Sequence, residues 1–262
     1  ELNYRARAGT PSINRLELLI KKSADVGSPA VSTVLRWNNV QWEKRVAVID
    51  LYGEAVGRIA AAVDIPVSVD MEAGYGRAPE AAVASCRAVL DAGGVGANLE
   101  DAADDAPHAL VPIEAHAAKI AAVRKMADAY GVPLVINART DVFLHKVGAE
   151  SGRVGEATAR LRRYREAGAD CLFAPGVVDA ATIRTLVEQV DAPLNILAMP
   201  GCPSVAELEA LGVRRMSQGS GPMRAVLALT RQIARELVDS GTYVSFQRDA
   251  MSYPEANRLF ER

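Results

Sequence analysis

Short apolar runs alternate with longer amphipathic stretches along most of this chain, and that alternation limits the folds it can adopt. Helical stretches such as 79–94 and 154–170 show apolar residues at three- and four-residue spacing, and several end in glycine. Strand–helix–strand units repeated at roughly 25–40 residues are typical of a parallel sheet. We predict strands at 29–35, 65–70, 95–100, 133–139, 170–175, 193–198 and 214–219.

The number of strands favours a closed barrel. Seven clear strands and an ambiguous segment near 13–20 suggest an α/β fold of the (β/α)₈ TIM barrel type. An open doubly wound sheet is the alternative, but no Gly-x-Gly-x-x-Gly follows the first predicted strand, which weakens its dinucleotide-binding version. We predict one barrel domain over residues 1–262, with a C-terminal helical extension at about 223–262.

Composition narrows the class of protein. The net charge is −2, from 30 Lys and Arg against 32 Asp and Glu, which argues against a general binder of nucleic acid or membrane surfaces. Cys86, Cys171 and Cys202 have no ligand-like spacing and are typical of reduced thiols. With no apolar run of transmembrane length and no signal peptide, we expect a cytoplasmic protein without a membrane partner.

Polar residues follow the predicted strands at their carboxyl ends. Asp70 and Glu72 come after one strand, Glu100 after the next, then Arg139 and Asn195. A helix N-cap explains an acid after any single strand. Because the carboxyl ends of barrel strands meet at one mouth, polar groups after several strands favour an active site.

These residue types suit a metal and an anionic ligand. Asp70, Glu72 and Glu100 supply oxygen donors, which suit Mg²⁺, with Mn²⁺ as an alternative; Mg²⁺ needs only one or two direct carboxylates. Arg139 offers a fork for a carboxylate or phosphonate, although it could instead pair with Asp141. The set describes a pocket for a small, doubly anionic oxo acid.

Six segments in collinear order resemble the isocitrate lyase/phosphoenolpyruvate mutase superfamily, over about Ile59 to Arg262. They are "DMEAGYG", "GANLEDA", "VINARTDVFL", "RYREAGADCLFAPGV", "PLNILAMPGCPSVAELEALGVRRMSQG" and "GTYVSFQRDAMSYPEANRLF". The resemblance implies a Mg²⁺-binding barrel, usually a homotetramer whose last helix is exchanged between paired subunits; a dimer is the alternative. Such enzymes make or break a C–C or P–C bond beside a pyruvate-like enolate.

The resemblance also implies individual roles. Asp70 matches the direct metal ligand, while Glu72 and Glu100 match acids that hold metal-bound waters. Arg139 matches the arginine that grips the acidic group of the substrate, and Asn195 matches an asparagine that contacts a carboxylate.

The first 58 residues depart from the family pattern. Only Ser32 and Thr33 remain of the Thr-Ser-Gly whose backbone holds substrate, and Glu43 falls near the place of a missing family acid. The segment "AADDAPHAL" lacks the cysteine, lysine and glycine of the isocitrate lyase lid, which argues against a true isocitrate or methylisocitrate lyase. His108 is a candidate proton donor there, but a surface position without a catalytic role is the favoured interpretation.

Three functions follow. The first is a Mg²⁺-dependent lyase or hydrolase that cleaves a C–C bond of a 2-oxo or 2-hydroxy diacid, resembling oxaloacetate or an alkylmalate, through a metal-stabilised enolate. The second is the P–C chemistry of a phosphoenolpyruvate mutase or phosphonopyruvate hydrolase. The third is a catalytically silent barrel with a binding or assembly role.

His116 and His145 are expected at the surface.

Overall fold

The computed structural model describes residues 45–103, 106, 108–247 and 250–260, with side chains from Gly53 onward. The predicted strand at 29–35 and the ambiguous segment at 13–20 lie outside these residues. The chain divides into two compact units, one ending at Gly219 and the other running from Ser220 to Arg262. Each is described by itself, and the expected single barrel domain with an extension from about 223 stays a prediction.

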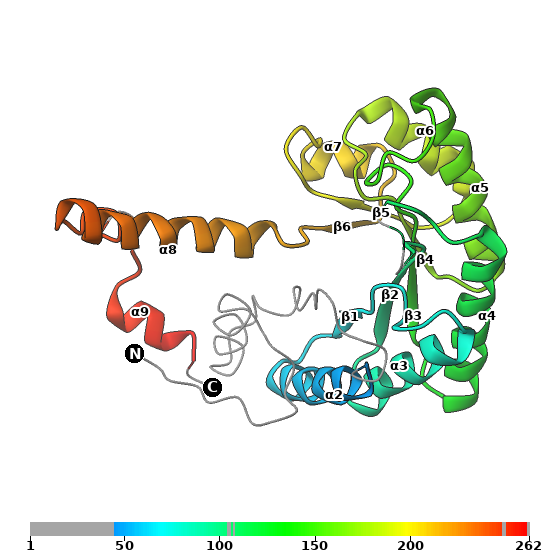
Figure 1. Ribbon diagram of the computed structural model, residues 1–262, viewed down its shortest axis with the longest axis horizontal. Coiled ribbons are helices and arrows are strands. Elements are labelled where there is room, and N and C mark those ends of the chain that lie inside the picture. Colours follow the sequence, from blue (N-terminus) through cyan, green and yellow to red (C-terminus); the bar gives the residue numbers. More distant parts are fainter. Residues whose placement is uncertain (1–44, 104–105, 107, 248–249, 261–262) are drawn as a thin grey trace. The chain divides into compact units, whose positions relative to one another are not determined.

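The described part of the first unit contains a parallel sheet in which each strand pairs with the next along the chain (Figure 1). Every strand lies within one of the predicted runs, which confirms those predictions. The strands are β1 (Ser68–Asp70), β2 (Gly96–Glu100), β3 (Val135–Arg139), β4 (Cys171–Phe173), β5 (Leu194–Leu197) and β6 (Arg215–Ser217).

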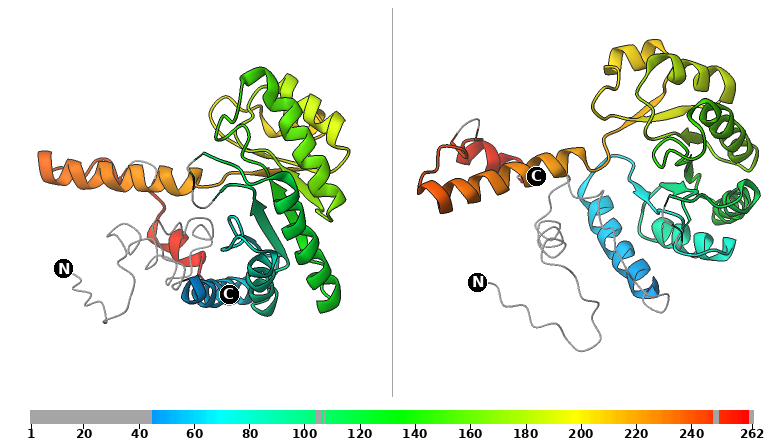
Figure 2. Two further views of the ribbon diagram at one scale, coloured as in Figure 1. Left: turned by 45° about the vertical axis from the view of Figure 1, so that its right-hand side comes forward. Right: turned by 45° about the horizontal axis from the view of Figure 1, so that its top comes forward.

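Helices connect the strands and line one side of the sheet (Figures 1 and 2). They begin and end with ordinary capping chemistry. Ser204 and Glu207 form a reciprocal capping box, and α4 ends at Gly131 in the left-handed conformation, with φ 81°. The elements are α2 (Arg45–Ala62), α3 (Pro79–Asp91), α4 (Ile113–Tyr130), a 3₁₀ turn (Glu150–Gly152), α5 (Arg153–Glu166), α6 (Ala180–Val190) and α7 (Val205–Ala210).

Side chains alternate between the two faces of the sheet. Residues on the helix-facing side are apolar and buried, as in Leu99, Ile136 and Leu172. The residues that alternate with them toward the carboxyl ends of β2 and β3 are polar: Asn98, Glu100, Asn137 and Arg139. This period of two sends one set to the core and the other to the opposite face. The sequence therefore builds a hydrophobic layer under the helices and a polar inner face.

The sheet is curled. Arg215 Nη2 in β6 donates a hydrogen bond to Ser68 Oγ in β1 at 3.5 Å, although these are the first and last strands of the described sheet. The observed fold is thus a curled, parallel α/β fold. Closure into eight strands stays a prediction, since it requires strands in residues that the structure does not describe.

The second unit contains α8 (Gly221–Ser240) and α9 (Tyr253–Arg258). The chain after α8 folds back on the Glu236 carboxylate, which accepts hydrogen bonds from the backbone N–H groups of Val244 and Ser245 at 2.7 and 2.8 Å. The Ser245 and Thr242 side chains, followed by these backbone N–H groups, lower the pKa of Glu236 to about 2. Among the described helices, none combines the length and apolar character needed to cross a membrane.

Candidate active site

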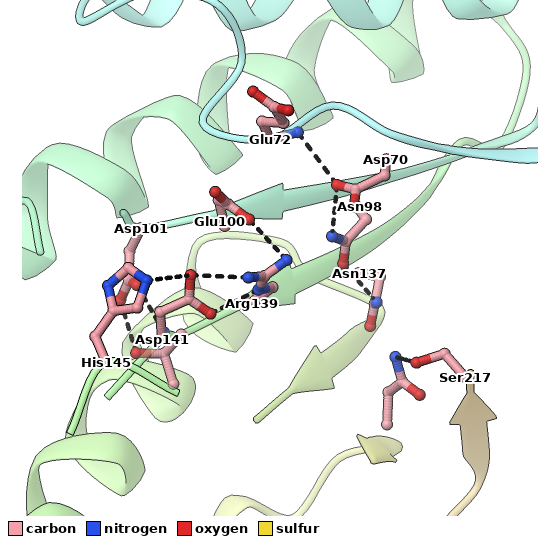
Figure 3. Close-up of polar contacts among 12 residues, drawn as sticks. Asp70, Glu72, Asn98, Glu100, Asp101, Asn137, Arg139, Asp141, His145 and Ser217 are labelled. Atoms are coloured by element: carbon pink, nitrogen blue, oxygen red, sulfur yellow. Dashed lines mark hydrogen bonds and ion pairs between the residues drawn. The ribbon is translucent and has the colours of Figure 1, made fainter. Parts of the chain in front are cut away.

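The predicted site residues lie at the carboxyl edge of the sheet. Asp70, Glu100 and Arg139 are the last residues of β1, β2 and β3, and Asn195 lies in β5. Figure 3 shows Asp70, Glu72, Glu100 and Arg139 in one region. Parallel strands bring these residues together even though they are far apart in the sequence.

Arg139 is held on both sides by carboxylates. Its Nη1 lies 2.7 Å from Glu100 Oε2, while its Nε and Nη2 donate to the two oxygens of Asp141 at 2.6 and 2.9 Å. Burial alone would lower the pKa of Arg139, but Glu100 and Asp141 outweigh it and raise that pKa. The Arg139–Asp141 pair, one of the alternatives from the sequence, is therefore present.

Glu100 experiences an excess of negative charge. Its pKa rises to about 8, first because burial disfavours the charged carboxylate and further because Asp141, Asp70 and Glu72 repel it. Arg139 opposes this rise without cancelling it. Arg139 thus pairs with Glu100 and Asp141 while Asp70 adds negative charge beside them, and a further cation would relieve the repulsion.

The donor chemistry fits Mg²⁺ bound by few protein ligands. Asp70 Oδ1 accepts hydrogen bonds from Asn98 Nδ2 at 2.9 Å and Glu72 N at 3.2 Å, whereas no described residue donates to Asp70 Oδ2. No three acidic, histidine or cysteine side chains of the described part form a cage for a metal. Mg²⁺ usually keeps several waters and one or two carboxylates, so a site centred on Asp70 fits it.

The loop after Asp70 has an unusual backbone. Glu72 and Tyr75 adopt positive φ values of 48° and 56° without being glycine. Gly74, at φ 85°, is required, because a Cβ there would lie 2.7 Å from the Cβ of Ala82. Buried Lys119 of α4 donates to the carbonyls of Ala73 and Gly76 at 2.8 and 2.6 Å, which holds this loop in place.

The left-handed backbone at Glu72 predicts that a glycine there would increase stability but reduce turnover. A non-glycine residue with left-handed φ costs on the order of 1 kcal/mol, so Glu72→Gly is expected to raise the free energy of unfolding by about 1 kcal/mol while reducing turnover. Lys146, exposed and at φ 53°, is the matched control: Lys146→Gly should stabilise similarly and leave turnover unchanged. Chemical denaturation and the assay described below measure both. A loss of stability in Glu72→Gly alone would contradict the strain argument.

Asp101 has a different role from its neighbour Glu100. It is fully buried, and its Oδ2 accepts hydrogen bonds from Thr140 Oγ1 and the Tyr164 hydroxyl at 2.7 Å each and from Arg160 Nη1 at 3.1 Å. Its Oδ1 accepts from the backbone N–H of Asp141 at 3.0 Å. Asp101 therefore ties α5 to the segment that grips Arg139.

Sequence reasoning missed two asparagines on the inner face. Asn98 donates to Asp70, and Asn137 Nδ2 donates to Asn98 Oδ1 at 2.8 Å. The available signal was a polar residue at every second position of two buried strands. The Nδ2 of the predicted residue Asn195, which is fully buried, lies 3.5 Å from Ser217 Oγ.

The remaining predictions have mixed outcomes. Ser32, Thr33 and Glu43 lie outside the described residues. His108 is exposed, and its ring lies 5.1 Å from that of His145, whose Nε2 is 3.9 Å from Asp141 Oδ2.

The surface position expected for His116 is wrong. His116 of α4 is fully buried, with its ring edge-on to that of Tyr164 in α5 at 4.7 Å between centroids. Small alanines surround it in α4, so the sequence gives no strong contrast between the faces of this helix, and its buried face accepts a polar ring.

Comparison with known proteins assigns the family. The profile of the phosphoenolpyruvate phosphomutase family matches residues 40–238. The chain therefore belongs to this family, within the isocitrate lyase/phosphoenolpyruvate mutase superfamily, which confirms the resemblance seen in the sequence.

This chain spans only part of the length of the relatives that it matches. An uncharacterised protein of Mycobacterium tuberculosis is 34% identical over 173 residues, which are 66% of this chain and 62% of that protein. Oxaloacetate decarboxylase 2 of Pseudomonas fluorescens is 30% identical over 216 residues, 79% of this chain and 68% of the relative. A crystal structure of a candidate lyase/mutase from Burkholderia cenocepacia is 34% identical with a TM-score of 0.76, covering 82% of this chain and 76% of that one.

Proposed function

We propose that this protein is a Mg²⁺-dependent lyase or hydrolase that cleaves a C–C bond of a small 2-oxo or 2-hydroxy diacid through an enolate. One observation carries the proposal: the buried guanidinium of Arg139 pairs with Glu100 and Asp141 at the carboxyl ends of parallel strands, and Asp70 lies near enough to repel Glu100. The Pseudomonas fluorescens relative is named an oxaloacetate decarboxylase, which supports this class of substrate.

Asp70 would hold the metal directly, and Glu72 and Glu100 would hold its waters. When bound, a divalent cation stabilises negative charge on an enolate oxygen. Asn98 and the Glu72 backbone, both bonded to Asp70 Oδ1, leave its Oδ2 for the cation.

Arg139 would bind a carboxylate of the substrate. Its Nη1 pairs with Glu100, and a substrate carboxylate would take the place of Glu100 there while Asp141 remains bonded to Nε and Nη2. Asn195 would donate from Nδ2 to a second carboxylate. Held at both ends, the substrate would break its C–C bond with the electron pair left on the fragment that becomes the enolate, which then takes up a proton from solvent. In a 2-oxo diacid such as oxaloacetate the other fragment would leave as CO₂. In a 2-hydroxy diacid the hydroxyl would lose its proton, and its carbon would become the carbonyl of the other product.

The test is turnover with and without chelator. We expect the wild type to release pyruvate-like or oxalate-like products from a panel of oxaloacetate and alkylmalates, EDTA to abolish release and Mg²⁺ to restore it. Asp70→Ala should lower turnover at least about a thousandfold, while Asp64→Ala, an exposed acid before β1, should not change it. Unchanged turnover after chelation, or full activity of Asp70→Ala, would rule the mechanism out.

The second candidate is P–C chemistry, which the description of the matching family favours. Arg139 would then bind the phosphonyl group. The same panel therefore includes phosphonopyruvate, followed by phosphorus NMR; an unchanged signal removes this candidate, and a new signal without C–C cleavage replaces the first.

We further propose a cytoplasmic homotetramer, with a dimer as the alternative, in which the C-terminal helix is exchanged between subunits. All three cysteines are free, which is typical of reducing compartments. Helix α8 is amphipathic over 20 residues, yet none of its residues is buried, and Val226 and Val238 are 63% and 83% exposed. Such a face commonly packs against another subunit.

Light scattering after size exclusion tests this assembly. We expect a tetramer mass for the wild type and a smaller species for Val226→Glu, because a charge in an apolar interface is disfavoured. Arg231→Glu is the control for a charge change on α8 outside its apolar residues. A monomeric wild type would contradict the exchange.

A further inference from the structure

A row of three hydrogen-bonded polar side chains lies on the inner face of the sheet. Asp70, Asn98 and Asn137 occupy paired positions on β1, β2 and β3. Asn98 Nδ2 donates to Asp70 Oδ1 at 2.9 Å, and Asn137 Nδ2 donates to Asn98 Oδ1 at 2.8 Å (Figure 3). Two side-chain amides thus continue the hydrogen bonding of one carboxylate across three strands.

The Asp70 carboxylate determines how the two side-chain amides in this row are oriented. An ionised carboxylate only accepts hydrogen bonds, so Asn98 must turn its NH₂ group toward Asp70. Its carbonyl oxygen then faces β3 and needs a donor, which the NH₂ group of Asn137 supplies. The assignment of oxygen and nitrogen in both amides therefore follows from Asp70, and flipping either would place two acceptors in contact.

The last acceptor in this row, Asn137 Oδ1, has no donor among the described residues. Asn137 is 3% exposed, and its Oδ1 has no hydrogen-bond partner in the described part of the protein. Figure 3 shows Asn137 between Asn98 and Ser217. Asn195 Oδ1 is also buried without a partner, but the nearby Ser217 hydroxyl can donate or accept, so the orientation of Asn195 is not fixed in the same way. Asn137 is the clearer case.

A buried carbonyl oxygen is normally paired, so a ligand group with a hydrogen to donate fits this position. At neutral pH the keto, carboxylate and phosphonate groups of an oxo acid are mainly acceptors, whereas an alcohol hydroxyl donates. We propose that Asn137 is a specificity-determining residue whose Oδ1 accepts a hydrogen bond from a substrate hydroxyl, so that the site prefers 2-hydroxy diacids to their analogues without the hydroxyl. This inference rests on the proposed function and selects one of the two substrate classes that it leaves open.

The test uses malate and succinate, which differ by one hydroxyl, in calorimetric titrations with Mg²⁺. We expect the wild type to bind malate at least about tenfold more tightly than succinate. Replacing Asn137 with leucine, or with alanine should the leucine variant not fold, should reduce this ratio to about one. Val135→Ala, on the same strand and face but apolar and half-exposed, should keep the wild-type ratio.

Oxalate separates this inference from the proposed function, because its dianion has no hydrogen to donate. If oxalate binds the wild type with Mg²⁺ but malate binds no better than succinate, the role of Asn137 is overturned and the proposed function stands. An unchanged malate-to-succinate ratio in the foldable Asn137 variant also overturns it, since another group then recognises the hydroxyl. If oxalate does not bind at all, the proposed function fails and this inference falls with it.

Discussion

Arg139→Leu is expected to lower the free energy of unfolding by about 3–5 kcal/mol and to abolish turnover. Arg139 is 7% exposed, and its guanidinium makes three close contacts with the carboxylates of Glu100 and Asp141. Leucine fills part of the volume but leaves these two buried acids without a cation. Their mutual repulsion and lost solvation cause the destabilisation, and the missing fork removes substrate binding.

Two further variants separate buried charge from general loss of an arginine. Arg124→Leu removes the partner of Asp170 in a more exposed ion pair, so its expected cost is below about 1 kcal/mol. Arg139→Lys keeps the charge without the planar fork and should fall between wild type and Arg139→Leu in stability. Urea denaturation at neutral pH measures all three. Equal stability of Arg139→Leu and wild type would show that the carboxylates do not depend on Arg139.

Mild acid is expected to destabilise the protein through His116. Burial is the main cause that lowers the pKa of His116 from 6.5 to about 4, with Lys119 and Arg160 adding to the effect and Asp101 opposing it. Between these values the unfolded chain binds a proton at this position and the folded chain does not. The stability contribution is therefore present above about pH 6.5 and lost as the pH falls toward 4, by about 3 kcal/mol.

Substitution of the ring isolates this effect from other acid-sensitive groups. His116→Phe keeps a flat ring against Tyr164 and removes the titration, so its stability should fall less than that of the wild type between pH 7 and pH 4.5, by about 2–3 kcal/mol. The exposed His108 is the control, and His108→Ala should keep the full wild-type dependence. Parallel pH profiles for His116→Phe and wild type would disprove the buried, neutral state of His116.

The strands were predictable because each is a short apolar run bounded by turn residues. Only their ends differ: the predicted strand at 65–70 begins at Ser68, since Ile65 is 71% exposed and Pro66 has no N–H for the ladder. The convergence of Asp70, Glu100 and Arg139 also followed from the sequence, because parallel strands end at the same edge.

The supports of the site were not predictable in the same way. Lys119, Arg160 and Tyr164 lie on helices, and their contacts with the strand ends depend on how those helices pack. In the sequence they have the spacing of ordinary helix residues. Asn137 was missed for another reason: a single asparagine in a strand signals weak strand propensity, and only its pairing with Asn98 reveals a role.

Calorimetric titration of oxalate, as a mimic of the enolate, tests most directly whether Asp70 and Arg139 bind a divalent cation and an anionic ligand together. With Mg²⁺ present, we predict saturable binding to the wild type, at least about a hundredfold weaker binding in EDTA, and none to Asp70→Ala. Equal affinity for oxalate with Mg²⁺ and with EDTA, retained in Asp70→Ala, would contradict the account.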